Sequence, residues 1–533
     1  MKIQNIQRLF GLVLNMILSV YMLLILIVMP FYNQEGFSHI GTDKSTFLRA
    51  CNRNTAKILV PVLLLYLVFT LIREIQKKSL SQTVQGIRLS VTEYFMLAYA
   101  GCVLLSYAFS DYRDVVWRGQ EGWYMGTTTQ LAMVAIFFLI GRTWKRQDWL
   151  FFTILPTSAV VFALGFINRF GIYPIDMKVD NVMFISTIGN INWYCGYMMS
   201  VFFSGFALLW QSERWKWWQN ILLGAYVVVG YASLVTQGSS SGIITLLAMF
   251  LVTFCFSVSN EKRMCMFWTQ TVIFFTVCLL IRLLRLRGWA TITYIEASTE
   301  WLTNSTLPIV MTIVSVSILL WLVCLELRKR YPESVFRAIA VAVCASVLVL
   351  FVAYVIVLVI NTVTDGKITD MTGMPQNDLL TFSPKWGSNR GATWTAGVLC
   401  FLEQDLWHKL FGAGPDGMAS FLYAGGSEKL LSLVKETFGS SRLTNAHNEW
   451  LTILVNLGVL GFVSYVGMMV SAIWRFLRQR NNSPIVTACG FCLLAYTVNN
   501  MFSFQQAMNV STIFILLGIG ENYLRQSREK KSA

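Results

Sequence analysis

The stretch Leu9–Phe31, LFGLVLNMILSVYMLLILIVMPF, decides the class of fold because none of its side chains carries a charge. A helix needs about 20 apolar residues to cross the roughly 30 Å hydrocarbon core of a membrane, and this stretch is long enough. It is too long for the apolar core of a signal peptide, and no convincing small-residue cleavage site follows it. We therefore predict that the stretch remains in the protein as a membrane anchor.

The rest of the chain repeats this pattern of apolar stretches separated by polar connections. Hydrophobic residues make up 55% of the 533 residues and charged residues only 13%, about half the charged share of a soluble protein. We expect an all-α fold, a polytopic membrane helix bundle of about 14 transmembrane helices that forms one integral membrane domain over residues 1–533. The expected spans are 9–31, 57–72, 91–109, 127–141, 149–168, 191–210, 219–236, 240–258, 267–284, 306–326, 337–360, 447–473, 484–502 and 508–524.

The formal net charge of +15 would suit a nucleic-acid-binding protein only if the Lys and Arg side chains formed one basic face. They recur instead in short clusters between the apolar stretches, which is the pattern of the positive-inside rule. We therefore exclude nucleic acid as a partner and use the clusters to set the topology. They place both termini in the cytoplasm and the longest connections on the opposite side of the membrane.

One of these outer connections, residues 361–446, forms a large extracytoplasmic loop of about 85 residues. Loops of this length are usually functional or disordered, and the composition of this one favours order. Trp394–Leu410 has the pattern of an amphipathic helix that would end at the Gly412–Pro415 breaker, and 427–437 has that of a second short helix. We expect these helices to lie along the outer membrane surface and to frame a cavity.

Two residues in or beside this loop have side chains suited to chemistry. His447 precedes an apolar stretch, where a partly shielded neutral imidazole can accept a proton from an attacking hydroxyl. The alternative is a histidine at the membrane interface that caps the helix or holds the loop. Arg390 precedes the expected surface helix, where its guanidinium can hold phosphate oxygens in a bidentate fork. The alternative is an arginine that extends toward lipid headgroups.

Four motifs around these residues resemble the signature of the O-antigen ligase and O-antigen polymerase superfamily. They are Arg390 with Trp394 four residues on, the turn Leu410–Pro415, the segment His447–Leu451, and the glycine pattern in Asn456–Gly461. Their order and spacing match the family pattern, and the likeness is specific over residues 387–461. More weakly, the segment Ile188-Gly189-Asn190-Ile191-Asn192 is similar to a turn of the same family.

The resemblance implies a glycosyltransferase of a bacterial cytoplasmic (inner) membrane that needs no metal and no other cofactor. Such an enzyme moves a glycan from an undecaprenyl diphosphate carrier to an acceptor hydroxyl at the outer face of the membrane. Its partners would be the lipid-linked glycan donor, a glycan, lipid or protein acceptor, and the membrane lipids. His447 would serve as the general base and Arg390 would neutralise the diphosphate leaving group, with inversion at the anomeric carbon. Whether the reaction is a ligation or a polymerisation stays open.

This sequence departs from the family pattern at Gln237–Gly242, QGSSSG, where many members have an arginine between a serine and a glycine. If that arginine contacts the lipid phosphates, another cation has to do so here, and Arg118 is the first candidate and Arg442 the second. Two further residues are expected at the substrate. Asn448 would orient His447, or else cap a helix, and Trp394 belongs to the arginine motif.

Three alternative functions remain in view. Asp111 and Asp114 could belong to the acidic motif of metal-dependent membrane glycosyltransferases, although their spacing is loose. A lipid or small-solute transporter would need essential polar residues at mid-membrane depth, whereas charges are nearly absent from the middle of the expected spans. A non-catalytic member of the family with a role in envelope assembly is the third alternative, supported by the missing arginine.

Overall fold

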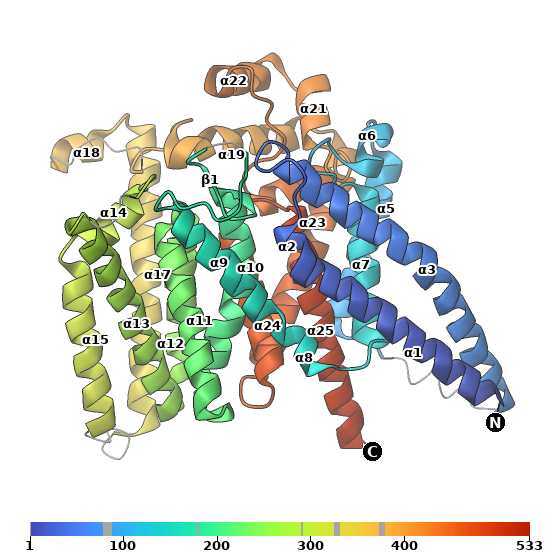
Figure 1. The fold of residues 1–533 in the computed structure, drawn as a ribbon. Helices are drawn as coiled ribbons and strands as arrows, with labels where there is room; N and C mark the ends of the chain where they lie inside the picture. The colour runs from blue at the N-terminus through green and yellow to red at the C-terminus, as the bar shows by residue number, and fades with distance from the viewer. Residues whose placement is uncertain are drawn as a thin grey trace.

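The computed structural model describes residues 2–77, 88–178, 181–288, 292–324, 331–372 and 379–532. These residues form a bundle of helices, and the two strands among them, β1 (Phe184–Ile185) and β2 (Gly189–Asn190), are two residues each and pair antiparallel (Figure 1). The expected all-α class is therefore confirmed.

Nine helices or helix runs in the described part of the chain are long and apolar enough to cross a membrane, or ten if a bent pair counts as one span. Each of the fourteen expected spans coincides with a helix over most of its length, but the count of fourteen stays a prediction. The first of the nine is the run of α1 (Lys2–Leu23), η1 (Leu24–Val28) and α2 (Met29–Phe31), and another is the run of α8 (Asp148–Phe152) and α9 (Ile154–Asn168). The other seven are single helices: α3 (Ile40–Gln76), α5 (Val91–Phe109), α11 (Trp217–Thr236), α12 (Ser240–Ser257), α13 (Glu261–Leu286), α17 (Glu333–Val363) and α23 (Glu449–Leu477). The bent pair is α14 (Ala297–Asn304) with α15 (Leu307–Cys324). The other long helices are α7 (Thr127–Arg142), α10 (Ile191–Trp210), α24 (Pro484–Asn499) and α25 (Ala507–Ser532).

Helix α10 lies at the centre of the bundle, because nearly all of its side chains are buried. It packs against α24 on one side and against α9 and α11 on the other. Small residues allow this close approach: a Cβ added at Gly205 or Gly230 would lie 2.3 Å or 2.2 Å from the ring of Tyr226 or Phe202. The close packing fixes the position of the α10 N-terminus, which matters for the site described below.

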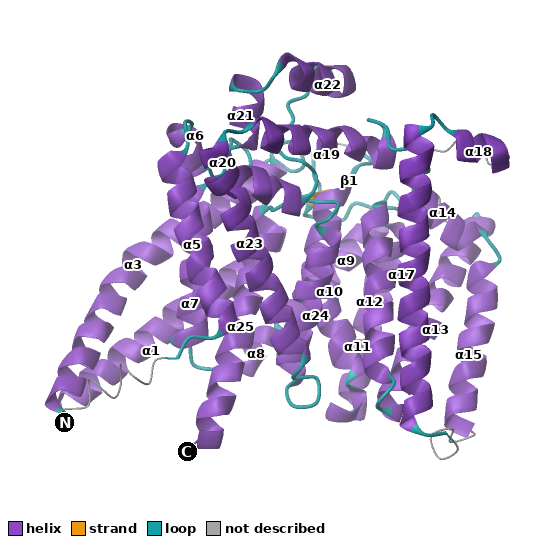
Figure 2. Cartoon of the chain, turned by 180° about the vertical axis from the view of Figure 1, so that it is seen from behind, coloured by secondary structure: helices purple, strands orange, loops and turns teal. Residues whose placement is uncertain are grey.

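One end of the bundle carries the helices of the 361–446 segment, and we call it the loop face. Figures 1 and 2 show α19 lying across this end with α22 above it, while both chain ends lie at the opposite end. The helices of the segment are α18 (Lys367–Thr372), α19 (Trp386–Glu403), α20 (Leu406–Phe411), α21 (Met418–Ala424) and α22 (Glu428–Phe438). The predicted second helix at 427–437 is thus confirmed as α22.

The predicted helix Trp394–Leu410 is wrong in its bounds, because the structure has two helices there. The chain becomes extended at Gln404, whose side-chain amide donates to Val455 O at 2.9 Å. Asp405 then caps α20 by accepting a hydrogen bond from His408 N at 2.8 Å. The predicted end at the glycine turn is confirmed, since α20 stops at Phe411 and Gly412 has a φ of 83°.

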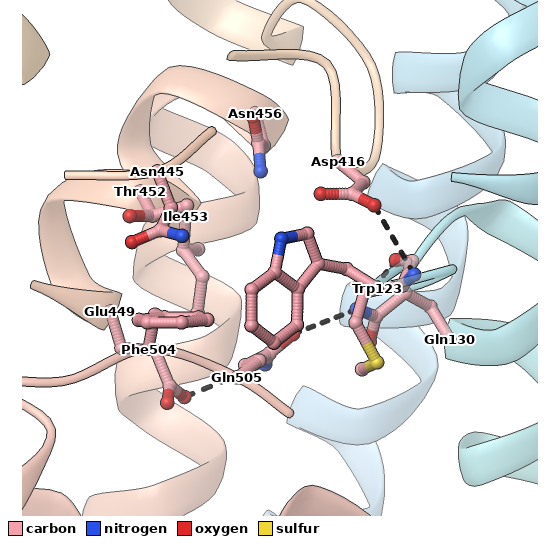
Figure 3. Close-up of a pocket in the computed structure, with 11 residues that line it drawn as sticks. Trp123, Gln130, Asp416, Asn445, Glu449, Thr452, Ile453, Asn456, Phe504 and Gln505 are labelled. Carbon is pink, nitrogen blue, oxygen red and sulfur yellow. Dashed lines mark hydrogen bonds between the residues drawn. The ribbon is translucent and has the colours of Figure 1, made fainter. Parts of the chain in front are cut away.

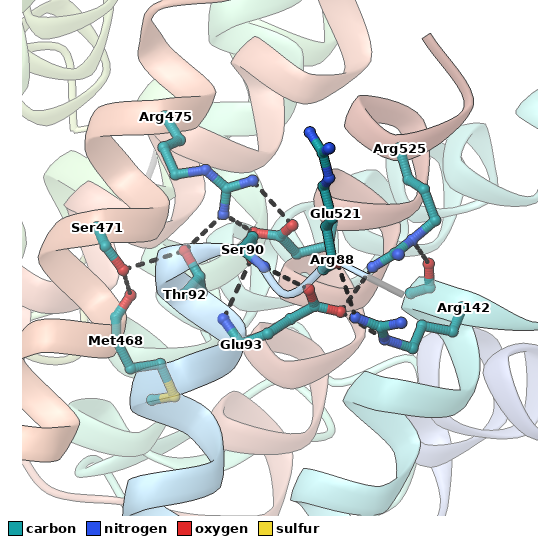
Figure 4. Close-up of polar contacts among 11 residues, drawn as sticks. Arg88, Ser90, Thr92, Glu93, Arg142, Met468, Ser471, Arg475, Glu521 and Arg525 are labelled. Atoms are coloured by element: carbon teal, nitrogen blue, oxygen red, sulfur yellow. Dashed lines mark hydrogen bonds and ion pairs between the residues drawn. The ribbon is translucent and has the colours of Figure 1, made fainter. Parts of the chain in front are cut away.

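The end opposite the loop face is held by ion pairs between four helices, in which the carboxylates are buried and the arginines partly exposed (Figure 4). Glu93 at the start of α5 accepts from Arg142 of α7 at 2.8 Å and from Arg525 of α25 at 2.6 Å. Glu521 of α25 pairs with Arg475 of α23 in the same cluster. These contacts fix the four helices to one another, and α23 leads from here to the loop face.

Candidate functional site

A cavity of about 250 Å³ opens at the loop face, and we call it the His447 cavity. It brings together Arg390 and His447, the two predicted catalytic residues. One wall, the Arg390 wall, consists of Ser388, Asn389, Arg390, Thr393, Phe438 and His447. The other lining residues come earlier in the chain, and we call them the Glu296 wall: Met183, Ile191, Asn192, Gly238, Ser239, Ser240, Tyr294 and Glu296. The cavity is lined by residues of α19 that precede the predicted helix Trp394–Leu410 and by Phe438, the last residue of α22, which follows the predicted range 427–437.

Arg390 stands at a break in α19, where the three preceding residues have left-handed φ values between 58° and 67°. Its Nη1 donates to Gly387 O at 2.9 Å and its Nε to Phe502 O at 3.3 Å. Its Nη2 donates to none of the residues that the structure describes, and no carboxylate among them pairs with it. Burial lowers the pKa of the guanidinium below its ordinary value, yet an arginine remains charged at neutral pH. The half-buried cation is therefore available to an anion in the cavity.

His447 lies two residues before α23 in a left-handed conformation, with a φ of 47°. Its backbone N donates to Asn445 Oδ1 at 3.0 Å, and its ring meets the edge of Phe504 at 5.3 Å between centroids. Burial and the nearby charge of Arg390 lower the pKa of the imidazole to about 4. At neutral pH the ring is therefore neutral and has a lone pair that can accept a proton.

The Glu296 wall is a network of polar side chains from three elements. Glu296 caps α14 by accepting from Ser298 N at 2.8 Å, and its other oxygen accepts from Ser240 Oγ. Ser239 Oγ donates to Asn192 Oδ1 at 2.9 Å. Asn192 belongs to the turn that the sequence analysis singled out, but Glu296 was not predicted as a site residue. A single acidic side chain in an outer connection does not by itself indicate a functional site. Only the fold brings Glu296 into the same cavity as Arg390.

A further cation, Arg169, lies behind this wall and was also missed. Its Nη1 donates to Val182 O at 2.6 Å, and its Nη2 donates at 2.5 Å to the carbonyl of Gln237 in the QGSSSG turn. The guanidinium lies 5.3 Å from the ring centroid of Tyr294, and its side chain is fully buried. Burial lowers the pKa of Arg169 to about 10, so it stays charged at pH 7. It supports the turn that lacks the family arginine without lining the cavity itself.

The four predicted substrate-binding residues lie outside the cavity lining. Arg118 is exposed at the end of α6 (Arg113–Arg118), and the exposed Arg442 lies 5.2 Å from the ring centroid of Tyr423. Asn448 caps α23, because its Oδ1 accepts from Leu451 N at 3.1 Å. Trp394 stacks on Phe502 at 6.1 Å, the residue whose carbonyl accepts from Arg390.

Two glycine motifs hold the loop helices to α23 by a contact between backbones. Ala413 N and Gly414 N donate to the carbonyls of Val455 and Asn456, both at 3.0 Å. These two carbonyls can accept hydrogen bonds from outside the helix because α23 is interrupted at Gly458, which has a φ of 65° and a ψ of −173°. A Cβ there would lie 2.3 Å from Leu410 C. The two glycine motifs therefore meet where the turn Leu410–Pro415 crosses the backbone of α23 at Gly458, beside the site.

A second, smaller cavity of about 40 Å³ lies behind His447, and Phe504 contributes to its lining (Figure 3). Asp416 faces it and accepts from the backbone N of Gln120 at 2.8 Å and of Met125 at 3.2 Å. Burial raises the pKa of the Asp416 carboxyl to about 7. On the other side, Glu449 accepts hydrogen bonds from Tyr465, Tyr496 and Asn500. Phe504 therefore lies between His447 and a buried acidic region.

In the described ranges, no three His, Cys, Asp or Glu side chains come together in a way that could hold a metal ion. Asp111, one of the two residues considered for a metal motif, lies with its Oδ2 3.6 Å from His408 Nε2. Asp111 and Asp114 are both exposed and do not line the His447 cavity.

Residues 297–466 match the model of a protein family described as O-Antigen ligase. This segment contains both Arg390 and His447, and it supports the predicted resemblance to the O-antigen ligase and polymerase superfamily. No curated protein matches the chain.

Proposed function

Because residues 297–466 match the O-antigen ligase family, we propose that this chain is a membrane glycosyltransferase that uses a glycan on undecaprenyl diphosphate as its donor. The acceptor is a hydroxyl group of a second substrate, and the reaction takes place at the loop face. This face points away from the cytoplasm of a bacterial inner membrane, and both termini lie inside. The observation that carries the proposal is the meeting of Arg390 and His447 in one cavity.

In the proposed reaction, the free Nη2 of Arg390 binds an oxygen of the diphosphate. The acceptor oxygen attacks the anomeric carbon from the face opposite the diphosphate, and the bond between that carbon and the leaving oxygen breaks. The bonding electrons pass to the diphosphate, whose added charge Arg390 stabilises. The hydroxyl proton passes to His447. Because the acceptor attacks from the face opposite the diphosphate, the configuration at the anomeric carbon inverts.

The two residues depend on each other through their charges. Arg390 contributes to the low pKa of His447, which makes the free imidazole a weak base. A diphosphate bound to Arg390 offsets that positive charge and raises the pKa of His447 toward its ordinary value of about 6.5. Binding of the donor therefore strengthens the base at the moment when the acceptor needs it.

The Glu296 wall supplies partners for the sugar hydroxyls or the acceptor. Its carboxylate accepts hydrogen bonds, and the side chains of Ser239, Ser240 and Asn192 can both donate and accept. In this proposal, the Arg390 wall binds the charged leaving group and the Glu296 wall recognises the hydroxyl groups.

The test compares transferred glycan with accumulated lipid-linked precursor in cells that lack the native copy of the gene, at matched membrane levels of each variant. We expect His447→Ala and Arg390→Ala to lose product and accumulate precursor, and Glu296→Ala to do so in part. The exposed residues His39 and Arg287 give the matched controls His39→Ala and Arg287→Ala, which should behave like wild type. A wild-type phenotype for either cavity variant would refute its role. If the wild-type protein itself never consumes the donor, the transporter or structural alternative replaces the enzyme.

A further inference from the structure

A third cavity, of about 420 Å³, lies between α3 and α7, and none of its lining residues lines the His447 cavity. It also lies outside the segment 297–466 that matches the ligase family. Its lining residues are Thr46, Arg49, Ala50, Asn52, Arg53, Ala56, Thr128, Thr129 and Ala132. Neither the resemblance nor the proposed reaction explains why two arginines face this space.

The charges in this cavity are uncompensated. Arg49 and Arg53 are one helical turn apart and so share a face of α3, and Lys57 continues the same line. Neither arginine forms an ion pair with any residue in the described ranges. The Arg49 guanidinium lies 4.4 Å from the ring centroid of Tyr124, which orients it without neutralising it. The cavity therefore favours an anion.

The polar groups between the arginines and α7 can complete the binding of such an anion. Tyr21 OH donates to Asn52 Oδ1 at 2.8 Å, which leaves the amide nitrogen of Asn52 as a hydrogen-bond donor. The hydroxyl of Thr46 is exposed on the same face of α3. Guanidinium, amide and hydroxyl donors around one space suit the oxygens of a phosphate group.

The same helix also presents a surface for a lipid chain. Beyond Lys57, α3 is apolar, and its side chains Ile58, Leu64 and Val68 are exposed rather than covered by other helices. Figures 1 and 2 show α3 at the rim of the bundle, where only α1 runs beside it along its length. The basic line thus begins where the apolar surface ends, at the depth where lipid headgroups meet the hydrocarbon core.

We propose that the cavity between α3 and α7 binds the phosphate headgroup of a membrane lipid, whose chain lies along the apolar half of α3. Arg49 and Arg53 hold the phosphate oxygens, and Asn52 and Thr46 complete the site. The phosphate can belong to the polyprenyl carrier or to a glycerophospholipid, and only the first of these sources rests on the proposed function.

The test measures lipid binding to the purified full chain by native mass spectrometry and by titration, without any transfer assay. The probes are undecaprenyl phosphate, phosphatidylglycerol and undecaprenol, which has the same chain as the first but no phosphate. We expect both phosphate lipids to bind the wild type more tightly than undecaprenol. The double variant Arg49→Gln/Arg53→Gln should weaken their binding by about tenfold or more, and Arg49→Lys/Arg53→Lys should weaken it less. The matched control Arg113→Gln/Arg287→Gln removes the same charge from two exposed positions and should bind like wild type.

Competition between undecaprenyl phosphate and phosphatidylglycerol identifies the lipid that supplies the phosphate group. Tighter binding of undecaprenyl phosphate assigns the site to the carrier, and equal binding of the two phosphate lipids assigns it to ordinary phospholipids. The proposal is overturned if the glutamine double variant binds both lipids like wild type, or if undecaprenol binds as tightly as undecaprenyl phosphate. Asn52→Asp adds a negative charge without changing the size of the side chain, and it should also weaken lipid binding. This variant replaces the glutamine double variant in the test if the double variant does not fold. The binding assay involves no glycan transfer, so a failure of the proposed enzymatic role does not affect this result.

Discussion

At the scale of single residues, the pair Arg390 and His447 shows how position sets chemistry. A histidine in water has a pKa of about 6.5, whereas burial and Arg390 bring that of His447 to about 4. The ring of His447 therefore stays neutral at pH values where a histidine in water is already protonated. The sequence predicted both residues from their motifs, but it could not predict their environment, because the cavity is built from segments distant in the chain.

The low pKa of His447 makes a prediction about pH. A general base works only when unprotonated, so activity is present above its pKa and is lost as the pH falls through that value. Since kcat/KM reports the free enzyme, its loss at acid pH should lie near pH 4 rather than near 6.5. The pH dependence of kcat/KM with a purified lipid-linked donor measures this directly. The same titration of the His447 imidazole can be followed by NMR.

Removing Arg390 supplies the control for this prediction. In Arg390→Gln the positive charge that disfavours imidazolium is gone, so the NMR-detected pKa of His447 should rise toward its ordinary value. An unchanged pKa would mean that burial alone sets it, and that the donor does not strengthen the base in the way proposed.

At the scale of elements, the interruption of α23 is the feature that organises the site. The sequence predicted the helices of the loop segment and the turn at Gly412, since apolar periodicity and glycines are local signals. It did not predict the break at Gln404, because the hydrogen bond to Val455 that stabilises the extended backbone comes from a helix about fifty residues later. The residues Glu296 and Arg169 were missed for the same reason: their importance comes from contacts across the fold.

Gly458→Ala tests the crossing between α23 and the glycine turn. The backbone conformation at Gly458 is one that only glycine adopts easily, and the new Cβ would meet the backbone of Leu410 at 2.3 Å. We expect the variant to lose about 2–4 kcal/mol of stability, measured by thermal or denaturant unfolding of the purified protein. The matched control is Gly224→Ala in α11, where a Cβ meets nothing within 4 Å and alanine favours the helix. Equal stability of the two variants would show that the contact between α23 at Gly458 and the backbone of Leu410 is not rigid.

At the scale of the whole molecule, the positions of the helices were predictable and the arrangement of polar residues within them was not. Every expected span lies on a helix because apolar length is a strong signal in a membrane protein. The structure pairs the buried carboxylate of Glu93 with two arginines from other helices and that of Glu521 with one. Such pairings depend on which helices are neighbours, and one sequence does not contain that information.

Glu93→Gln tests whether the ion pairs opposite the loop face stabilise the bundle. The substitution keeps the shape of the side chain but leaves Arg142 and Arg525 without their shared carboxylate. Because both arginines are partly exposed, we expect a loss of about 2 kcal/mol rather than the larger cost of a fully buried pair. Thermal unfolding checks this, with Glu333→Gln as the control, since its pair with Arg337 is exposed and should contribute less than about 0.5 kcal/mol. Similar unfolding temperatures of the two variants would contradict a stabilising role.

The two walls of the His447 cavity divide along the chain in a way that bears on how its specificity can change. Every lining residue of the Arg390 wall falls within 297–466, and every lining residue of the Glu296 wall comes before it. In the proposed reaction, the residues that would meet the leaving charge and those that would meet the hydroxyl groups therefore come from different parts of the chain. Mutations before residue 297 can alter the choice of sugar or acceptor without touching the reactive pair. Residues 297–466 alone would not reproduce the site, because Arg390 also donates to Phe502 O and the His447 ring packs against Phe504.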